Sequence, residues 1–193
     1  MIATDAIAKR VWTEADLMSL PEDGHLHEVV AGELVMSPKN GFSHGHIATR
    51  LSTALNVFVI ERRLGVVLDS STGFWMNNRN CRAPDISFIP KERLRQMGFK
   101  PSAREFFPGA PDLAIEILSP NNTRREIDGR LQDFFESGTQ LAWIIDPEKR
   151  RVEVCQSPTR RAFLGSGGVL EGTDLLPGFR YPVAELFKEW AWE

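Results

Sequence analysis

The sequence predicts an α/β fold, in which a mixed sheet is flanked by helices. Two segments, residues 43–64 and 123–138, repeat apolar residues every three or four positions, which is the periodicity of an amphipathic helix. Short apolar runs lie around them, and residues 112–118 are apolar at nearly every position, as in a strand that is buried on both faces. Such an order of elements favours a sheet with helices packed on it.

The N-terminal part predicts a short helix and a β-hairpin. Thr13 can cap the helix, and Pro21 stops it. Residues 27–36 form two β-rich arms around Ala31-Gly32, and this pattern is typical of a tight hairpin turn.

Residues 43–64 predict the longest helix. Ser43 is placed to cap its start, and Gly65 follows its last turn, where a glycine often ends a helix. The second long helix, at residues 123–138, is expected to end at Gly138 for the same reason.

Strands are expected at residues 66–68, 73–76, 83–89, 112–118, 141–145, 152–155 and 161–164, the last two as an antiparallel pair. We interpret residues 90–109 as a helical turn with a loop outside the core. The glycine-rich residues 165–172 are interpreted as a hairpin loop, and residues 181–192 as a segment with a short helix.

The composition is that of one globular domain spanning residues 1–193. Hydrophobic residues make up 42% of the chain and charged residues 25%, and twelve Phe and five Trp can fill a core. The net charge of −3 excludes a strongly basic protein that coats DNA, but it allows a nuclease that touches nucleic acid through a local patch.

The compartment we expect is the cytoplasm. Cys81 and Cys155 are far apart in the sequence and belong to no metal-binding motif, so they are interpreted as free thiols in a reducing environment. The first residues hold no apolar core of signal-peptide length, and no segment is long and apolar enough for a membrane span.

Two acidic residues stand out because each interrupts a predicted core strand. Asp85 lies in the segment 83–89 and Glu116 in the segment 112–118. Strand side chains alternate between two faces, and an ionised carboxylate left unpaired in such a place is costly. Its partner could be a divalent cation, with two carboxylates and a carbonyl such as that of Ile117 as ligands, or it could be an arginine of a neighbouring helix.

The wider sequence resembles the Uma2 family of restriction-endonuclease-like proteins, within the PD-(D/E)XK nuclease superfamily. The matching stretches are His-Glu-Val-Val-Ala-Gly-Glu-Leu at 27–34, Ala-Pro-Asp at 83–85, Ala-Pro-Asp-Leu-Ala-Ile-Glu-Ile-Leu-Ser-Pro at 110–120, Trp-Ile-Ile-Asp-Pro at 143–147 and Leu-Leu-Pro-Gly at 175–178. The resemblance implies a core of helix, three strands, helix and strand. It also implies a DNA-cleaving site that uses Mg²⁺, with Mn²⁺ as the alternative, held by Asp85 and Glu116.

The sequence departs from the nuclease pattern at two positions. Leu118 stands where the pattern places a lysine, and the resemblance moves this role to Arg130 in the following helix, while Phe134 replaces a tyrosine. Arginine can bind a phosphate through two hydrogen bonds, but it is a poor general base because it stays charged. Arg130 therefore either stabilises charge in an active site or forms a structural ion pair with Glu116.

Two further residues are candidates for the site. The resemblance favours Glu28, for which an exposed hairpin glutamate is the alternative interpretation, and His44 at the start of the long helix could orient a phosphate or a water. A catalytically inactive module that binds or regulates, or a structural homodimer with Trp190 and Trp192 at its interface, remain the other functional hypotheses.

Overall fold

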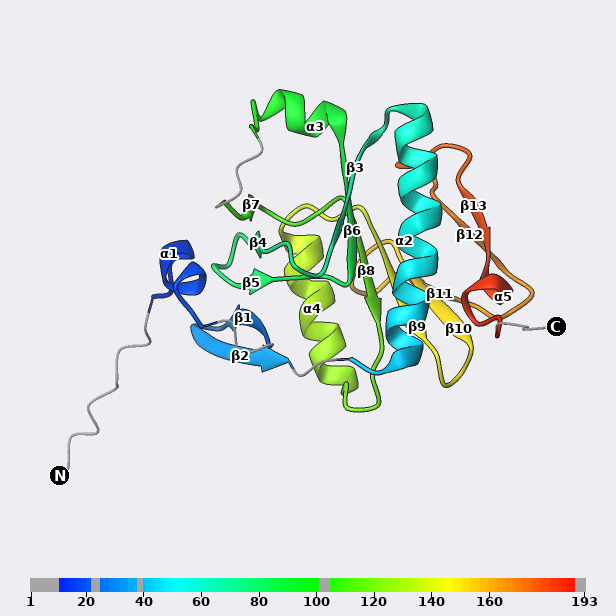
Figure 1. Cartoon of the computed structure of the whole chain (residues 1–193), viewed down its shortest axis with the longest axis horizontal. Helices are drawn as coiled ribbons and strands as arrows, with labels where there is room; N and C mark the ends of the chain where they lie inside the picture. The colour runs from blue at the N-terminus through cyan, green and yellow to red at the C-terminus, as the bar shows by residue number, and fades with distance from the viewer. Residues whose placement is uncertain (1–10, 22–24, 38–39, 101–104, 190–193) are drawn as a thin grey trace.

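The computed structural model describes residues 11–21, 25–37, 40–100 and 105–189, and a six-stranded sheet forms its centre (Figure 1). The strand order is β11-β10-β9-β8-β6-β3. The strands are β3 (Gly65–Asp69), β6 (Ile86–Pro90), β8 (Leu113–Ile117), β9 (Leu141–Asp146), β10 (Arg151–Cys155) and β11 (Arg161–Leu164). Only β8 and β9 run parallel among these neighbours, so the sheet is mixed, as predicted.

Two helices cover the two faces of this sheet, α2 (Phe42–Arg62) and α4 (Arg124–Glu136). Leu113, Ile115 and Ile117 of β8 pack in the same core cluster as the buried side of α2. Ala114, between them in sequence, packs in the cluster that holds the apolar side of α4. Each large side chain buried in this way contributes roughly 1.5–3 kcal/mol. The chain order α2, β3, β6, β8, α4, β9 confirms the predicted core of helix, three strands, helix and strand.

The ends of the long helix differ from the sequence-based expectation. Its N-cap is Gly41, which makes no side-chain hydrogen bond, so the predicted cap at Ser43 is wrong. Arg63 adopts the left-handed conformation at its C-terminus, with φ 54°, so Gly65 does not end the helix. Gly65 begins β3 instead, where a Cβ atom would lie 2.1 Å from the carbonyl oxygen of Ile89. The absence of a side chain at Gly65 lets β3 lie close to β6.

A second sheet lies beside α4, on the side away from α2 (Figure 1). Its strand order is β2-β1-β5-β4-β7. The strands are β1 (Leu26–Val30), β2 (Glu33–Ser37), β4 (Phe74–Trp75), β5 (Cys81–Arg82) and β7 (Phe107–Pro108). Ala31 and Gly32 both have positive φ, 52° and 81°, which confirms the predicted tight hairpin turn.

The predicted strands 73–76 and 83–89 need correction. Residues 74–75 belong to the second sheet, and β6 begins only at Ile86. Asp85 therefore does not lie inside a core strand; it occupies the bend between β5 and β6. Proline at position 84 cannot donate a ladder hydrogen bond, which suits a break in the strand there.

The remaining elements lie around the core and are α1 (Glu14–Met18), α3 (Lys91–Gln96), β12 (Val169–Glu171), β13 (Arg180–Pro182) and α5 (Val183–Leu186). Thr13 caps α1 and the helical turn after residue 90 is present, as predicted. The rest of the segment 90–109 is not a loop outside the core, because Phe107 belongs to β7 and is buried in a core cluster. The glycine-rich segment 165–172 is not only a loop, because it contains β12, which pairs with β13. The short helix predicted within residues 181–192 is α5, and residues 181–182 before it belong to that pair.

Trp190 and Trp192 lie outside the described residues, so the homodimer stays a prediction. None of the described helices combines the length and the apolarity that crossing a bilayer requires.

Candidate active site

Asp85 and Glu116 lie opposite each other at the end of β8. The antiparallel register pairs Ile86 of β6 with Ile115 of β8, and one further step along both strands places Asp85 across from Glu116. The backbone N–H of Ile117 donates a hydrogen bond to Oδ2 of Asp85 at 2.7 Å. This bond fixes the carboxylate beside the strand even though Asp85 itself lies in a bend.

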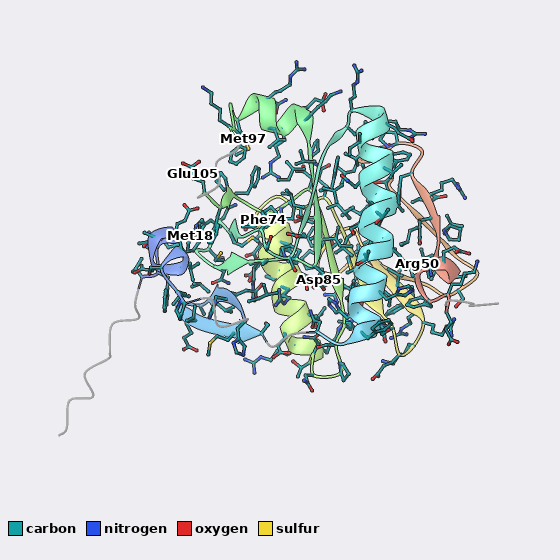
Figure 2. The ribbon with its side chains drawn as sticks, viewed as in Figure 1. Met18, Arg50, Phe74, Asp85, Met97 and Glu105 are labelled. Carbon is teal, nitrogen blue, oxygen red and sulfur yellow. The ribbon has the colours of Figure 1, made fainter. Side chains whose placement is uncertain are left out.

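His44 joins the site from the first turn of α2. Its Nε2 lies 3.1 Å from Oδ2 of Asp85. A carboxylate only accepts hydrogen bonds, so the ring nitrogen donates. Asp85 lies between α2 and α4 in Figure 2, and both helices contribute side chains around it. The contact gives His44 a role in orienting Asp85.

Glu28 of β1 is the most heavily bonded acid of the site. Arg130 binds it through two parallel hydrogen bonds, from Nη1 to Oε1 and from Nη2 to Oε2, both 2.8 Å long. Oε1 also accepts from the backbone N–H of Ala83 at 2.9 Å, and Oε2 from Arg82 at 3.4 Å. Glu28 is only 3% exposed, so its interpretation as an exposed hairpin residue is wrong.

Arg130 also reaches Glu116. Its Nη1 donates to Oε1 of Glu116 at 3.1 Å, in addition to the bonds with Glu28. Glu116 shares the α4 side of β8 with Ala114, and Arg130 projects from the helix that covers this side. Of the two roles considered for Arg130, the ion pair with Glu116 is therefore present in the structure.

A second layer of polar residues was not foreseen from the sequence. Asp133 of α4 is 5% exposed and accepts hydrogen bonds from Arg82 at 2.7 Å, Asn78 at 2.6 Å and Asn80 at 2.9 Å. The helix periodicity gives no signal for it, because Asp133 lies off the apolar side that Ile127, Leu131 and Phe134 form, where a solvated residue is expected. This layer holds Arg82 against Glu28.

The site carries more negative than positive charge. Four carboxylates (Glu28, Asp85, Glu116 and Asp133) face the two guanidinium groups of Arg82 and Arg130. With His44 neutral, the excess is two negative charges when all four acids are ionised. In a buried cluster such an excess is costly unless a cation or protons balance it.

The pKa of Glu116 reflects this imbalance. Burial is the largest cause that raises the pKa of its carboxyl group; Arg130 lowers this pKa, Asp85 and Glu28 raise it, and the result is a pKa of about 8. Burial opposes the charge of Arg130, but Glu116 and Glu28 more than offset this and raise the pKa of its guanidinium group above the ordinary value. Arg130 thus stays charged, and Glu116 readily takes up a proton.

Asp85 and Glu116 can supply only part of the oxygen ligands that Mg²⁺ requires. Among the described residues, no group of three or more His, Cys, Asp or Glu side chains is arranged to hold a metal. Within the same residues, Oδ1 of Asp85 and Oε2 of Glu116 accept no hydrogen bond from the protein. Mg²⁺ is commonly held by one or two carboxylates, with waters and substrate phosphates as the other ligands. The pair fits that pattern.

A family model named Uma2 and described as "Putative restriction endonuclease" matches residues 14–184. The chain belongs to the Uma2 family. A solved structure is similar to it over 91% of this chain and 97% of that chain, with a TM-score of 0.78 and 22% identity. Its title is "Crystal structure of a putative nuclease belonging to DUF820 from Anabaena variabilis ATCC 29413 at 1.96 A resolution", and at this identity it shows the fold alone. No curated protein matches the chain.

The five site residues predicted from the sequence lie in one cluster: Asp85, Glu116, Arg130, Glu28 and His44. Phe134, which replaces the tyrosine, is fully buried in the core under α4. It therefore has no group to offer to the site.

Glu28→Gln is expected to lower the free energy of unfolding by about 3 kcal/mol. The change removes both charge-assisted bonds between Arg130 and Glu28 and leaves Arg130 with the single, longer bond to Glu116. Urea unfolding measures the change. Glu185→Gln is the control, because Glu185 pairs with Arg50 at 3.4 Å near the surface and should cost less than about 1 kcal/mol. Equal effects of the two changes would contradict the role of Glu28.

The raised pKa of Glu116 predicts a specific pH dependence of stability. The ordinary pKa is 4.5 and the folded value about 8, so between these pH values the folded chain holds a proton that the unfolded chain has lost. This contribution is fully present below pH 4.5 and is lost as the pH rises to about 8. In Glu116→Gln it is absent, so the variant should gain stability relative to wild type as pH increases. A difference in unfolding free energy that stays constant with pH would show that Glu116 titrates normally.

Proposed function

We propose that the protein is a Mg²⁺-dependent endonuclease that hydrolyses phosphodiester bonds of DNA, with Mn²⁺ as an alternative metal. The observation that carries the proposal is the pair Asp85 and Glu116, held opposite each other in a buried cluster where four carboxylates face two guanidinium groups. A divalent cation would balance that excess. The Uma2 membership supports the same chemistry.

Asp85 and Glu116 would hold the metal through the oxygens that accept no hydrogen bond from described residues. When bound, Mg²⁺ would stabilise negative charge on the phosphate and make a water more acidic. His44 keeps Asp85 in place, and Glu28 keeps Arg130 extended toward Glu116. Arg130 remains protonated, so it would bind and stabilise the phosphate but would not remove a proton.

The placement of the helices supports a phosphate substrate. Both α2 and α4 begin at the end of the sheet where β8 ends (Figure 1). Helix N-termini carry a partial positive charge and unpaired N–H groups, which favour anions. A DNA strand lying along this end of the sheet would meet both termini beside Asp85 and Glu116.

The proposal also includes the cytoplasm as the compartment. Cys81 and Cys155 are free and buried, and burial raises the pKa of each thiol to about 12, so neither is poised for reaction. Free thiols suit a reducing compartment.

A homodimer is part of the same hypothesis, and light scattering of the full chain tests it.

Metal binding provides the first test. Calorimetry with Mg²⁺ or Mn²⁺ should show binding to the wild type, and Asp85→Asn should lower the affinity by at least about tenfold, since changes outside the ligand shell already cost that much. Asp69→Asn is the control, because Asp69 is an exposed carboxylate at the end of β3. The same wild-type protein should cleave DNA with Mn²⁺, and Glu116→Gln should not. Absence of binding, or equal binding by all three proteins, would refute the metal site.

One observation favours a second candidate function, a nuclease-fold module that binds or regulates without catalysis. Arg130 binds Glu28 and Oε1 of Glu116, and its positive charge there opposes a metal ion at Oε2 of Glu116. If this ion pair is permanent, the site is inert. The two candidate functions therefore predict different DNA cleavage rates when the hydrogen bonds of Arg130 to Glu28 and Glu116 are weakened.

Arg130→Lys separates them. Lysine is a compact charge that cannot bind Glu28 through two parallel bonds and reach Glu116 as well, so Glu116 is freed for a metal. In an enzyme the Mn²⁺-dependent cleavage rate should rise about tenfold, which corresponds to the loss of one charge-assisted hydrogen bond. Arg124→Lys is the matched control, since Arg124 of the same helix binds Glu153 through two bonds of 2.8 and 3.0 Å. If neither the wild type nor Arg130→Lys cleaves DNA, the protein is a non-catalytic module.

A further inference from the structure

A cavity of about 210 Å³ lies on the α4 side of the central sheet, beside the candidate active site. The parallel register of β8 and β9 pairs Glu116 with Ile144, and Ile144 lines the cavity. Leu118, two residues after Glu116, lines it as well. Neighbouring strands are about 4.8 Å apart, so the cavity begins one strand away from the metal ligand.

The cavity wall contains three cationic side chains, Arg124, Lys149 and Arg151, and two carboxylates, Asp146 and Glu153. Arg124 is already engaged by Glu153 through two hydrogen bonds. The other two are held more loosely, because Nζ of Lys149 and Nε of Arg151 lie 3.5 and 3.6 Å from Asp146. These distances are longer than ordinary hydrogen bonds, so both donors remain available to a ligand.

Arg151 forms the long ion pair with Asp146, but its buried Nε atom lacks a hydrogen-bond acceptor among the described residues. Its guanidinium group stacks on the ring of Phe163 at 4.3 Å, which fixes its plane next to the cavity. A buried N–H group without an acceptor is costly, and an anionic oxygen in the cavity would satisfy it.

We propose that this cavity binds a phosphate group of the DNA strand that runs into the active site, through Lys149 and Arg151. The inference rests on the proposed nuclease function and adds where the substrate is held. A phosphate offers several anionic oxygens, which match the ammonium group of Lys149 and the oriented guanidinium group of Arg151. The apolar part of the wall, Leu118, Ile127 and Ile144, would face the sugar.

The distance between the cavity and Glu116 suits a phosphate that lies near the cleaved one on the same DNA strand. Lys149 and Arg151 lie on β10 and the turn before it, two strands from β8, which is about 10 Å at the usual strand spacing. A DNA strand advances about 3.4 Å along the helix axis per nucleotide, so the contact would fall within about three nucleotides of the metal site. Phosphate contacts of this kind fix the position of the DNA without reading its sequence.

The test compares two matched lysine variants. Lys149 is 64% exposed and pairs with Asp146 three residues earlier at 3.5 Å; Lys188 is 63% exposed and pairs with Glu185 three residues earlier at 3.5 Å. Binding of a labelled DNA duplex to the full chain is measured by fluorescence anisotropy in EDTA, over a range of salt concentrations. Lys149→Ala should weaken binding about three- to tenfold near 0.1 M salt and lower the slope of log Kd against log salt by about 1. Lys188→Ala should leave both unchanged.

Other results would overturn the inference. If the wild type binds DNA and both variants bind equally well, the cavity holds no backbone phosphate, while the proposed nuclease function stands. Equal weakening by both variants would show a general charge effect and would also overturn it. If the wild type binds no DNA, the proposed function and the inference fall together. Calorimetry with inorganic phosphate is the companion: phosphate binding lost in Lys149→Ala, with DNA affinity unchanged, would assign the cavity to free phosphate.

Discussion

Arg130 donates two hydrogen bonds to Glu28 and a third to Glu116, and these bonds join three distant parts of the chain. Glu28 belongs to the second sheet, Arg130 to the helix over the central sheet, and Glu116 to the central strand β8. Charged groups this deeply buried must be paired. The β1–β2 hairpin therefore has to pack against α4, because only then does Glu28 neutralise Arg130. The added hairpin is thus an integral part of the site.

The cluster holds fewer positive than negative groups, and this imbalance determines what the site can bind. Arg82 and Arg130 balance only half of the four carboxylates, and burial together with the neighbouring acids raises the pKa of Glu116 to about 8. A proton, a divalent cation and the guanidinium group of Arg130 therefore compete for the same carboxylate. In the proposed enzyme a divalent cation would take the place of the proton, and Arg130 would bind the phosphate.

The periodicities predicted the fold well where burial alone decides structure. Glu116 and its apolar neighbours alternate between the two faces of β8 as expected, and both long helices bury the predicted stripes. Prediction failed where tertiary contacts decide. Residues 74–75 joined another sheet, and Gly65 served strand packing rather than a helix end. Neither choice leaves a local pattern, because each depends on which distant segment lies alongside.

For the site, the sequence by itself determined the residue types: two acids in an apolar setting, an arginine in place of the lysine, and the Uma2 pattern. Only the tertiary structure decided their relations. It placed Asp85 opposite Glu116 through strand register, buried Glu28 against Arg130, and recruited Asp133 with Arg82 as a supporting layer. The physical reason is that local sequence sets which side chains face the core, whereas partner choice in a buried ion network depends on distances between segments far apart in the chain.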